Sequence, residues 1–176
     1  MDVVKARSAI VEIADYPEPG VVFKDVTPVF ADAAAFKFIV DSMANAFADR
    51  KITAVVGIEA RGFILGGALA QMMNVGFVPV RKLGKLPRET YRADYVLEYG
   101  TDAIEIHTDS LTTDDCVLIV DDVLATGGTV NATIQVIEQT GASVAGFAVL
   151  LNLDFLGGAS RIATDHPEVR LVSILD

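Results

Sequence analysis

The sequence predicts an α/β domain built on a mostly parallel central sheet with helices on both faces. Segments with helical periodicity alternate with short strand-like segments, and the central strands are rich in Val, Ile and Leu, as is typical of strands buried on both faces. The chain has 176 residues, of which 52% are hydrophobic, so a substantial core is available. We expect a single domain over residues 1–176.

Each expected element follows from its own pattern. Residues 31–51 are predicted to form an amphipathic helix with Asp32 as N-cap, and residues 62–74 a helix whose paired glycines allow close packing. Residues 129–142 are predicted to form a helix that ends at Gly141. Residues 94–99 and 103–108 alternate in polarity and are expected to pair antiparallel. The other expected strands are residues 53–58, 76–81, 116–122, 143–153 and 169–175.

Composition excludes several classes of function. The net charge of −10 argues against non-specific binding to nucleic acid or to anionic lipid. No apolar run approaches the roughly 18–20 residues of a membrane span, and charges interrupt the N-terminal segment, which does not resemble a signal peptide. Cys116 is the single cysteine, so no internal disulfide framework is possible. We expect a cytoplasmic protein.

Positive charge is concentrated in one segment. Five of the fourteen Lys and Arg residues lie in residues 81–92, "RKLGKLPRETYR". A basic segment in an acidic protein indicates a small, highly charged anion as ligand.

The stretch "VLIVDDVLATGGTV", residues 117–130, carries the most chemical information. It places Asp121 and Asp122 at the end of a predicted buried strand and a Thr-Gly-Gly-Thr turn before a predicted helix. Backbone N–H groups at a helix N-terminus favour an anion, and the hydroxyls of Thr126 and Thr129 add donors. Ionised carboxylates only accept hydrogen bonds, so the aspartates suit sugar hydroxyls beside that anion. The combination predicts a phosphoribosyl site.

Common nucleotide motifs are absent. Gly57 and Gly62 have the Walker spacing, but Phe63 and Ile64 stand where Lys and Ser or Thr would follow. No Gly-x-Gly occurs, which excludes the dinucleotide fingerprint. If their strands are neighbours, the loops in residues 57–63 and 120–129 should lie side by side at the carboxyl ends of the strands.

Residues 120–129 resemble the phosphoribosyl pyrophosphate motif of the type I phosphoribosyltransferases. Five stretches, "YPEPGVVFKDVTP", "GIEARGF", "VRKLGKLPRET", "LEYGTDAIEIH" and "VDDVLATGGT", follow the order seen in the members that act on adenine. The resemblance covers roughly residues 10 to 175. It implies that family's fold, with a small hood near residues 14–30 and a mobile lid near residues 82–93. It also implies transfer of 5-phosphoribose to N9 of adenine, with release of pyrophosphate and formation of AMP for purine salvage.

The resemblance assigns roles to individual residues. The catalytic residues would be Arg61 and Lys85, which contact pyrophosphate, and Glu98, which manages a purine ring proton. A closing lid would exclude water from the reacting centre. The other substrate contacts implied are Val22, Phe23, Lys24, Glu59, Ala60, Gly62, Arg81, Lys82, Tyr99, Asp121, Asp122, Ala125, Thr126, Gly127, Gly128, Thr129 and Leu153.

Within this set, the backbone of Val22 and Lys24 would read the edge of adenine, with Phe23 and Leu153 on its two faces. Asn152 stands where relatives often carry glutamate. The family also implies a cis peptide at Glu59–Ala60, a homodimer, and Mg²⁺ held mainly by substrate oxygens, with no ligands from protein side chains.

Two alternatives stay open from the sequence. One is a transferase for another purine, such as hypoxanthine or xanthine. The other is a regulator that senses phosphoribosyl pyrophosphate and binds DNA, which the net charge of −10 and the lack of a second domain disfavour.

Overall fold

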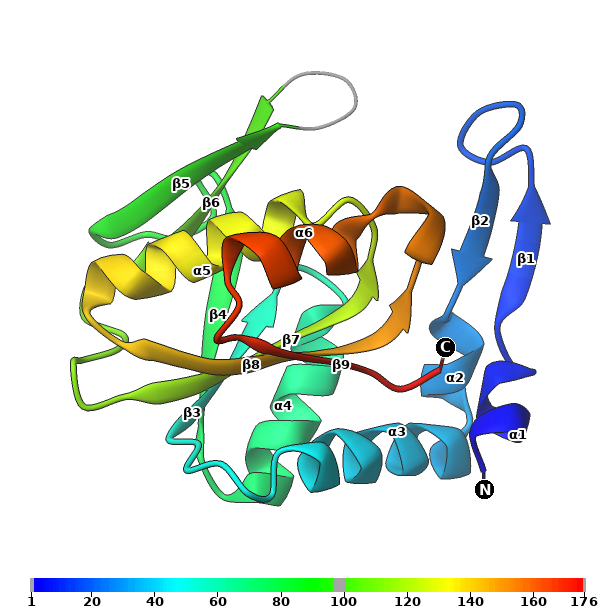
Figure 1. Cartoon of the computed structure of the whole chain (residues 1–176), viewed down its shortest axis with the longest axis horizontal. Helices are drawn as coiled ribbons and strands as arrows, with labels where there is room; N and C mark the ends of the chain where they lie inside the picture. Colours follow the sequence, from blue (N-terminus) through cyan, green and yellow to red (C-terminus); the bar gives the residue numbers. More distant parts are fainter. Residues whose placement is uncertain (1, 97–100, 176) are drawn as a thin grey trace.

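A seven-stranded sheet forms the centre of the molecule (Figure 1). The structure is a computed structural model that describes residues 2–96 and 101–175. The strand order is β5-β6-β4-β3-β7-β8-β9. The strands are β3 (Ala54–Ile58), β4 (Gly76–Lys82), β5 (Thr90–Val96), β6 (Thr101–His107), β7 (Cys116–Leu124), β8 (Ser143–Asn152) and β9 (Arg170–Ser173). From β4 to β9 the neighbours are parallel, whereas β6 runs antiparallel to β4 and β5, so the predicted mostly parallel sheet is confirmed.

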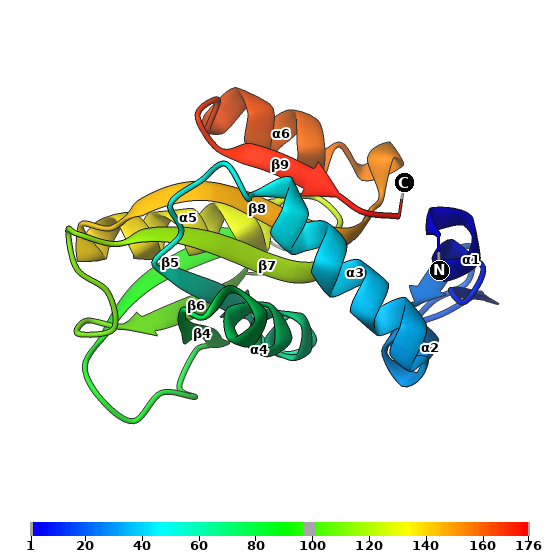
Figure 2. The ribbon, with the colours of Figure 1, turned by 90° about the horizontal axis from the view of Figure 1, so that it is seen from below.

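Helices cover both faces of this sheet (Figure 2). α3 (Ala33–Ala46) and α4 (Gly62–Met73) pack on one face, and α5 (Gly128–Thr140) and α6 (Gly158–Asp165) on the other. In β7, Leu118 belongs to the core under α3 and α4, whereas the next residue, Ile119, belongs to the core under α5. Because successive side chains of a strand point to opposite faces, a strand between two helical layers needs apolar residues at every position.

The predicted N-cap of α3 is confirmed. Oδ1 of Asp32 accepts hydrogen bonds from the backbone N–H groups of Ala34 at 2.8 Å and Ala35 at 2.9 Å. These two donors have no partner inside the helix, and the cap supplies one. The same two bonds lower the pKa of the Asp32 carboxyl, with the bond from Ala35 the larger cause.

The hood is a separate two-stranded antiparallel sheet of β1 (Val11–Ala14) and β2 (Val22–Asp25), at the right of Figure 1. It is flanked by α1 (Val3–Arg7) and α2 (Thr27–Ala31), and a short 3₁₀ turn, η1 (Asp154–Leu156), follows β8. Sequence periodicity did not predict α1, α2, η1 or α6, because elements of three to eight residues are too short to show a helical repeat.

β5 and β6 form the predicted antiparallel pair, but β5 begins at Thr90, earlier than expected. The lid expected near residues 82–93 therefore comprises the end of β4, a turn over residues 83–89, and the start of β5. Its mobility stays a prediction. Glu98 and Tyr99 lie outside the residues that the structure describes.

Candidate active site

The two loops singled out in the sequence lie side by side. β3 and β7 are parallel neighbours, with Gly57 opposite Val120, so the loops that follow them emerge at the same edge of the sheet. A Cβ atom on Gly62 would lie 2.8 Å from the carbonyl oxygen of Val120 and 3.0 Å from Oδ1 of Asp121. Only glycine allows the loop after β3 to approach the end of β7 this closely.

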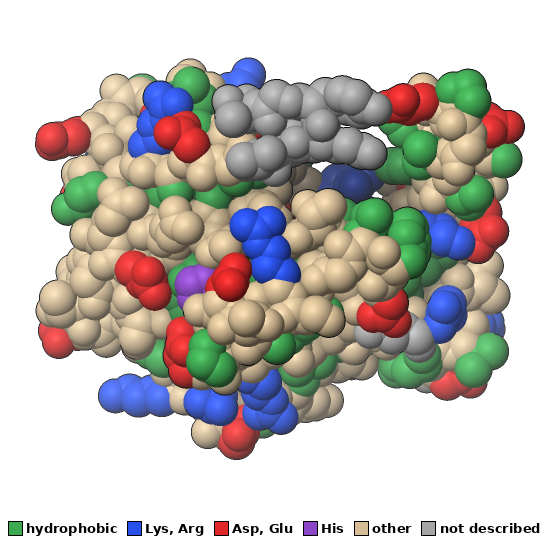
Figure 3. Space-filling view, turned by 45° about the horizontal axis from the view of Figure 1, so that its top comes forward, with side chains coloured by type: hydrophobic (Ala, Val, Ile, Leu, Met, Phe, Trp, Pro, Cys, Tyr) green, Lys and Arg blue, Asp and Glu red, His purple; other side chains and the backbone are tan. Residues whose placement is uncertain are grey.

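A cleft of about 710 Å³ opens between these loops and the hood. Figure 3 shows the corresponding hollow between the hood, at the right, and the body of the molecule, with a positively charged side chain inside it. The cleft brings together many of the residues expected from the sequence: Phe23, Glu59, Ala60, Arg61, Lys82, Asp121, Asp122, Ala125, Thr129 and Leu153.

Four lining residues were missed in the sequence: Ile58, Tyr95, Ile104 and Val123. Tyr95 is the polar one among them, and it lies on a strand whose alternation was recognised. The alternation separates the two faces of a strand but does not say which face borders a cleft. No sequence signal therefore singled out Tyr95.

Arg61 and Asp122, which both line this cleft, form an ion pair. Nε of Arg61 lies 2.5 Å from Oδ2 of Asp122, whose side chain is almost fully buried. That carboxylate oxygen accepts no hydrogen bond of regular geometry within the described part of the chain, so the guanidinium is its main compensation. The Arg61 guanidinium carbon also lies 5.9 Å from the ring centroid of Phe23, which places Arg61 between the acidic pair and the hood.

The carboxyl group of Asp121 is harder to ionise than an ordinary aspartate. Burial, reinforced by the neighbouring charge of Asp122, raises the pKa of Asp121 well above its ordinary value. Oδ1 of Asp121 accepts the backbone N–H of Asp122 at 2.9 Å. Both carboxylates line the cleft, where they can accept hydrogen bonds from hydroxyl groups of a ligand.

Next to the acidic pair is a smaller cavity of about 80 Å³, lined by the loop from Ala125 to Thr129. α5 begins at Gly128, and its N-cap, Gly127, has no side chain that could bond the first-turn amides. These N–H groups and the Thr129 hydroxyl are the donors expected to bind an anion, and that role stays a prediction. The cavity shares Asp121, Ala125 and Thr129 with the cleft, so an anion here would adjoin the aspartates.

The loop after β3 contains the predicted cis peptide between Glu59 and Ala60. The Glu59 carboxylate accepts hydrogen bonds from Arg81 Nη2 at 3.0 Å, Arg81 Nε at 3.2 Å and the Lys82 backbone N–H at 3.0 Å. The Arg81 hydrogen bonds are the main reason that the pKa of Glu59 is lowered. Arg81 thus binds Glu59 and does not line the cleft, and its role as a substrate contact stays a prediction.

The hood contributes an apolar pocket of about 610 Å³ that continues from the cleft. Val22, Phe23, Lys24 and Leu153, which were expected to surround the base, line it, and their binding of a base stays a prediction. Phe23 is held by an edge-on contact with Tyr16, at a centroid distance of 5.3 Å. Phe23 and Leu153 belong to both cavities, so a ligand that extends from the acidic pair would reach the hood.

No group of three or more His, Cys, Asp and Glu side chains is placed to hold a metal ion in residues 2–96 and 101–175. Over the same residues, no helix is both long enough and apolar enough to cross a membrane.

The comparisons with known proteins agree with this geometry. Residues 30–176 match the family model described as the phosphoribosyl transferase domain. An adenine phosphoribosyltransferase from Maricaulis maris (strain MCS10) is 55% identical over 156 residues, which is 89% of each protein. The crystal structure of adenine phosphoribosyltransferase from Thermoanaerobacter pseudethanolicus is 44% identical, with a TM-score of 0.92 over 98% of each chain.

A further solved structure is the crystal structure of the APRTase from Giardia lamblia complexed with 9-deazaadenine. It is 38% identical, with a TM-score of 0.93, over 99% of this chain and 97% of that one. Family model, sequence relatives and solved structures agree over nearly the whole length, and the chain therefore belongs to the phosphoribosyltransferase family, within its adenine branch.

Proposed function

We propose that this chain transfers 5-phosphoribose from phosphoribosyl pyrophosphate to N9 of adenine and so forms AMP and pyrophosphate in purine salvage. The observation that carries the proposal is one continuous site with three chemistries. An amide cradle at α5, a carboxylate pair, and an apolar pocket beside Phe23 follow one another in space. They match the order of phosphate, ribose and base in a nucleoside monophosphate.

The sugar phosphate would bind at the end of β7. Residues 125–129 would hold the 5′-phosphate through backbone N–H groups, and Asp121 and Asp122 would accept from the ribose 2′- and 3′-hydroxyls. In this role Asp122 exchanges part of its contact with Arg61 for hydroxyl donors, and Arg61 becomes available to the pyrophosphate.

Adenine would lie between Phe23 and Leu153 in the hood pocket. Among the described residues β2 pairs with β1 alone, so its other edge can offer backbone groups of Val22 and Lys24 to the 6-amino group and N1. A base with a carbonyl at position 6 would leave those groups unpaired, a mismatch that can discriminate by about 10⁴–10⁵. The complex of the Giardia lamblia relative with 9-deazaadenine supports a purine of this polarity.

In the transfer step, positive charge at the ribose carbon develops as pyrophosphate departs. Arg61 and Lys82, which line the cleft, and Lys85 in the neighbouring turn would offset charge on the departing group. Glu98, whose role rests on the family resemblance, would manage the purine ring proton as N9 attacks.

Mg²⁺ would accompany phosphoribosyl pyrophosphate, held mainly by substrate oxygens. The carboxylate pair fits this arrangement, because Asp121 and Asp122 line the cleft beside the expected ribose and would bind its hydroxyls, while the ion is held by oxygens of the substrate. When bound, the ion would neutralise part of the pyrophosphate charge. We also propose a cytoplasmic homodimer, on the basis of the single cysteine and the family resemblance.

The test is AMP formation from phosphoribosyl pyrophosphate with adenine, hypoxanthine, guanine and xanthine in parallel. Activity with adenine alone is expected, and loss of activity in Asp122→Asn would tie it to this site. A preference for another base would favour the alternative transferase. Binding of phosphoribosyl pyrophosphate without turnover of any base would favour a sensing role.

A further inference from the structure

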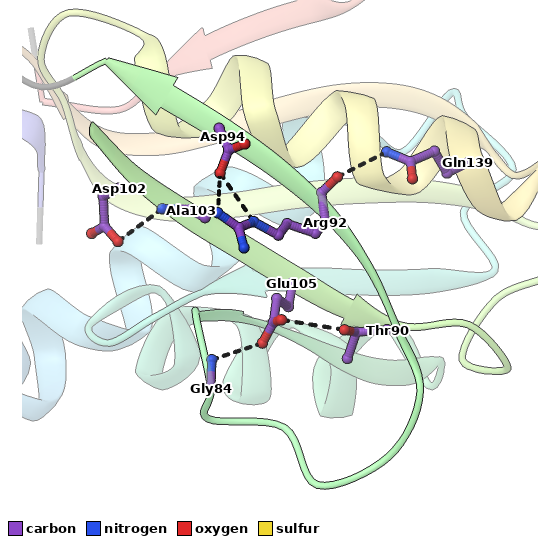
Figure 4. A network of polar contacts seen from close by, with 8 residues as sticks. All are labelled: Gly84, Thr90, Arg92, Asp94, Asp102, Ala103, Glu105 and Gln139. Carbon is purple, nitrogen blue, oxygen red and sulfur yellow. Dashed lines mark hydrogen bonds and ion pairs between the residues drawn. The ribbon is translucent and has the colours of Figure 1, made fainter.

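Glu105 is a buried carboxylate outside the cleft whose hydrogen bonds go to the turn between β4 and β5. Only 8% of its surface is exposed. Its Oε2 accepts the backbone N–H of Gly84 at 2.9 Å, and its Oε1 accepts the hydroxyl of Thr90 at 3.3 Å (Figure 4). Gly84 and Thr90 lie near the two ends of the turn, so one side chain holds both ends.

The two arginines that lie opposite Glu105 on the neighbouring strands bind other carboxylates. In the strand register Glu105 lies opposite Arg81 on β4 and Arg92 on β5. Arg81, however, binds Glu59. Arg92 binds Asp94 at 2.6 Å (Figure 4). Among the described residues Glu105 has no ion pair, so its hydrogen bonds to the turn are its compensation for burial.

The same turn also accepts a hydrogen bond from Arg81. Its Nη1 donates to the carbonyl oxygen of Lys85 at 3.2 Å while the rest of its guanidinium binds Glu59. The Gly84 N–H is thus bonded to Glu105, and Lys85 is bonded through its carbonyl oxygen to Arg81 and through its N–H to the Lys82 carbonyl oxygen at 3.2 Å. Gly84 has φ +75°, a conformation that glycine adopts without strain and that turns the chain at this point.

The hydrogen bonds of Glu105 and Arg81 to the turn fix the backbone of Gly84 and Lys85, and so limit the positions that the Lys85 ammonium can reach. The charge of Lys85 is one of the contributions, after Arg81 and the Lys82 amide, that lower the pKa of Glu59. The turn is joined to the loop that carries the cis peptide through Arg81, which donates to the Lys85 carbonyl oxygen at 3.2 Å and to the Glu59 carboxylate at 3.0 Å. The Lys85 side chain itself is exposed.

We propose that Glu105 is a positioning residue, which fixes the β4–β5 turn so that Lys85 faces the pyrophosphate end of the cleft. This inference rests on the proposed function. It implies that binding of the pyrophosphate group depends on a carboxylate that never contacts it. Binding of adenine, at the hood, should not depend on Glu105.

The test compares E105A, E105Q and a control, D115N. Asp115 is also a turn-holding carboxylate, which accepts the Thr112 N–H at 2.8 Å and the Thr53 hydroxyl at 2.8 Å, but it lies where β7 begins, at the opposite end of the sheet. E105A should raise KM for phosphoribosyl pyrophosphate and, in the reverse reaction, for pyrophosphate by about 10-fold. KM for adenine should stay within about twofold, and D115N should change none of these.

E105Q keeps an acceptor oxygen for the Gly84 N–H, so it should restore most of the affinity. Because Glu105 acts through Lys85, adding E105A to K85A should have little further effect. Additive losses, equal effects on adenine and pyrophosphate, or an E105Q variant as impaired as E105A would overturn the proposal. If E105A does not fold, E105D, which shortens the reach to Gly84, should show the same selective rise.

Hydrogen exchange provides a readout that is independent of turnover. The Gly84 amide should exchange faster in E105A than in the wild-type protein and in D115N. Unchanged exchange would exclude the clamp. If the wild-type protein forms no AMP, the proposed function fails, while this measurement still decides whether Glu105 holds the turn.

Discussion

The hydroxyl of Tyr95 lies 3.1 Å from Oδ2 of Asp102, directly across the β5–β6 pair. The same carboxylate oxygen is 3.5 Å from Nζ of Lys82, so Asp102 joins two residues that line the cleft. Burial raises the pKa of Tyr95, and the backbone N–H of Ala103 is the main cause of the lowered pKa of Asp102. At neutral pH the Tyr95 hydroxyl therefore donates a hydrogen bond to the Asp102 carboxylate. Lys82 both contacts this carboxylate and lines the cleft, where its ammonium can bind a substrate.

Replacing Tyr95 by Phe should weaken binding of phosphoribosyl pyrophosphate. Without the hydroxyl, Asp102 depends more on Lys82 and draws the ammonium away from the substrate. The loss of one hydrogen bond predicts a dissociation constant raised by about 2- to 10-fold, measured by calorimetry. Tyr91→Phe is the matched control, because Tyr91 lies on the same strand and packs against the same core but does not line the cleft. Equal effects of the two substitutions would contradict the assignment.

Replacing Asp121 by Asn should stabilise the unliganded protein at neutral pH. The pKa of Asp121 is raised in the folded state by burial and by Asp122, so the folded protein retains a proton that the unfolded chain releases. Stability is then lost as pH rises from the ordinary aspartate value, near 4, through the raised folded value. A gain of about 1 kcal/mol would raise the melting temperature by about 2–4 °C.

The advantage of Asp121→Asn should disappear below about pH 4, where the wild-type carboxyl is protonated in both states. Thermal unfolding of both proteins from pH 4 to pH 8 measures this. The variant should also bind phosphoribosyl pyrophosphate more weakly. A stability difference that does not change with pH would show that ionisation of Asp121 is not its cause.

Replacing Arg61 by Lys should lower kcat/KM for phosphoribosyl pyrophosphate by about 10- to 100-fold. The guanidinium of arginine can contact Asp122 and a phosphate oxygen at the same time. The ammonium of lysine carries its charge on a single nitrogen and has no such planar fork of donors. Initial rates over a range of substrate concentrations measure the effect. Arg50→Lys is the control, because Arg50 is exposed and its ion pair is with the adjacent Asp49. A fully active Arg61→Lys would exclude a forked contact.

Replacing Glu98 by Gln should separate chemistry from binding. Glu98 lies outside the described residues, so this prediction rests on the family resemblance alone. Loss of a group that accepts and returns a proton predicts a fall in kcat of about 10²-fold or more. Affinity for phosphoribosyl pyrophosphate should change little. Single-turnover rates beside equilibrium binding test both statements, and near-full kcat would assign the proton to water or to the backbone.

The main helices and strands and the chemistry of the two loops could be predicted from the amino-acid sequence. Helices α3, α4 and α5 and the parallel strands were readable because each is long enough for its apolar pattern to show which faces are buried. The phosphate loop after β7 and the loop after β3 were readable as contiguous motifs. Contiguous motifs carry their chemistry in residues that are neighbours along the chain, so folding does not need to be known to recognise them.

Features that depend on contacts between distant segments of the chain could not be predicted without the folded structure. The bonds from Arg81 to Glu59 and from Gly84 to Glu105 join residues 22 and 21 positions apart. The position of Tyr95 on the cleft, and the raised pKa of Asp121, likewise depend on which elements surround them. The pattern of apolar residues within a segment indicates its secondary structure and which of its faces is buried. The hydrogen-bond partner and the solvent exposure of a side chain come from whichever other segment packs against it.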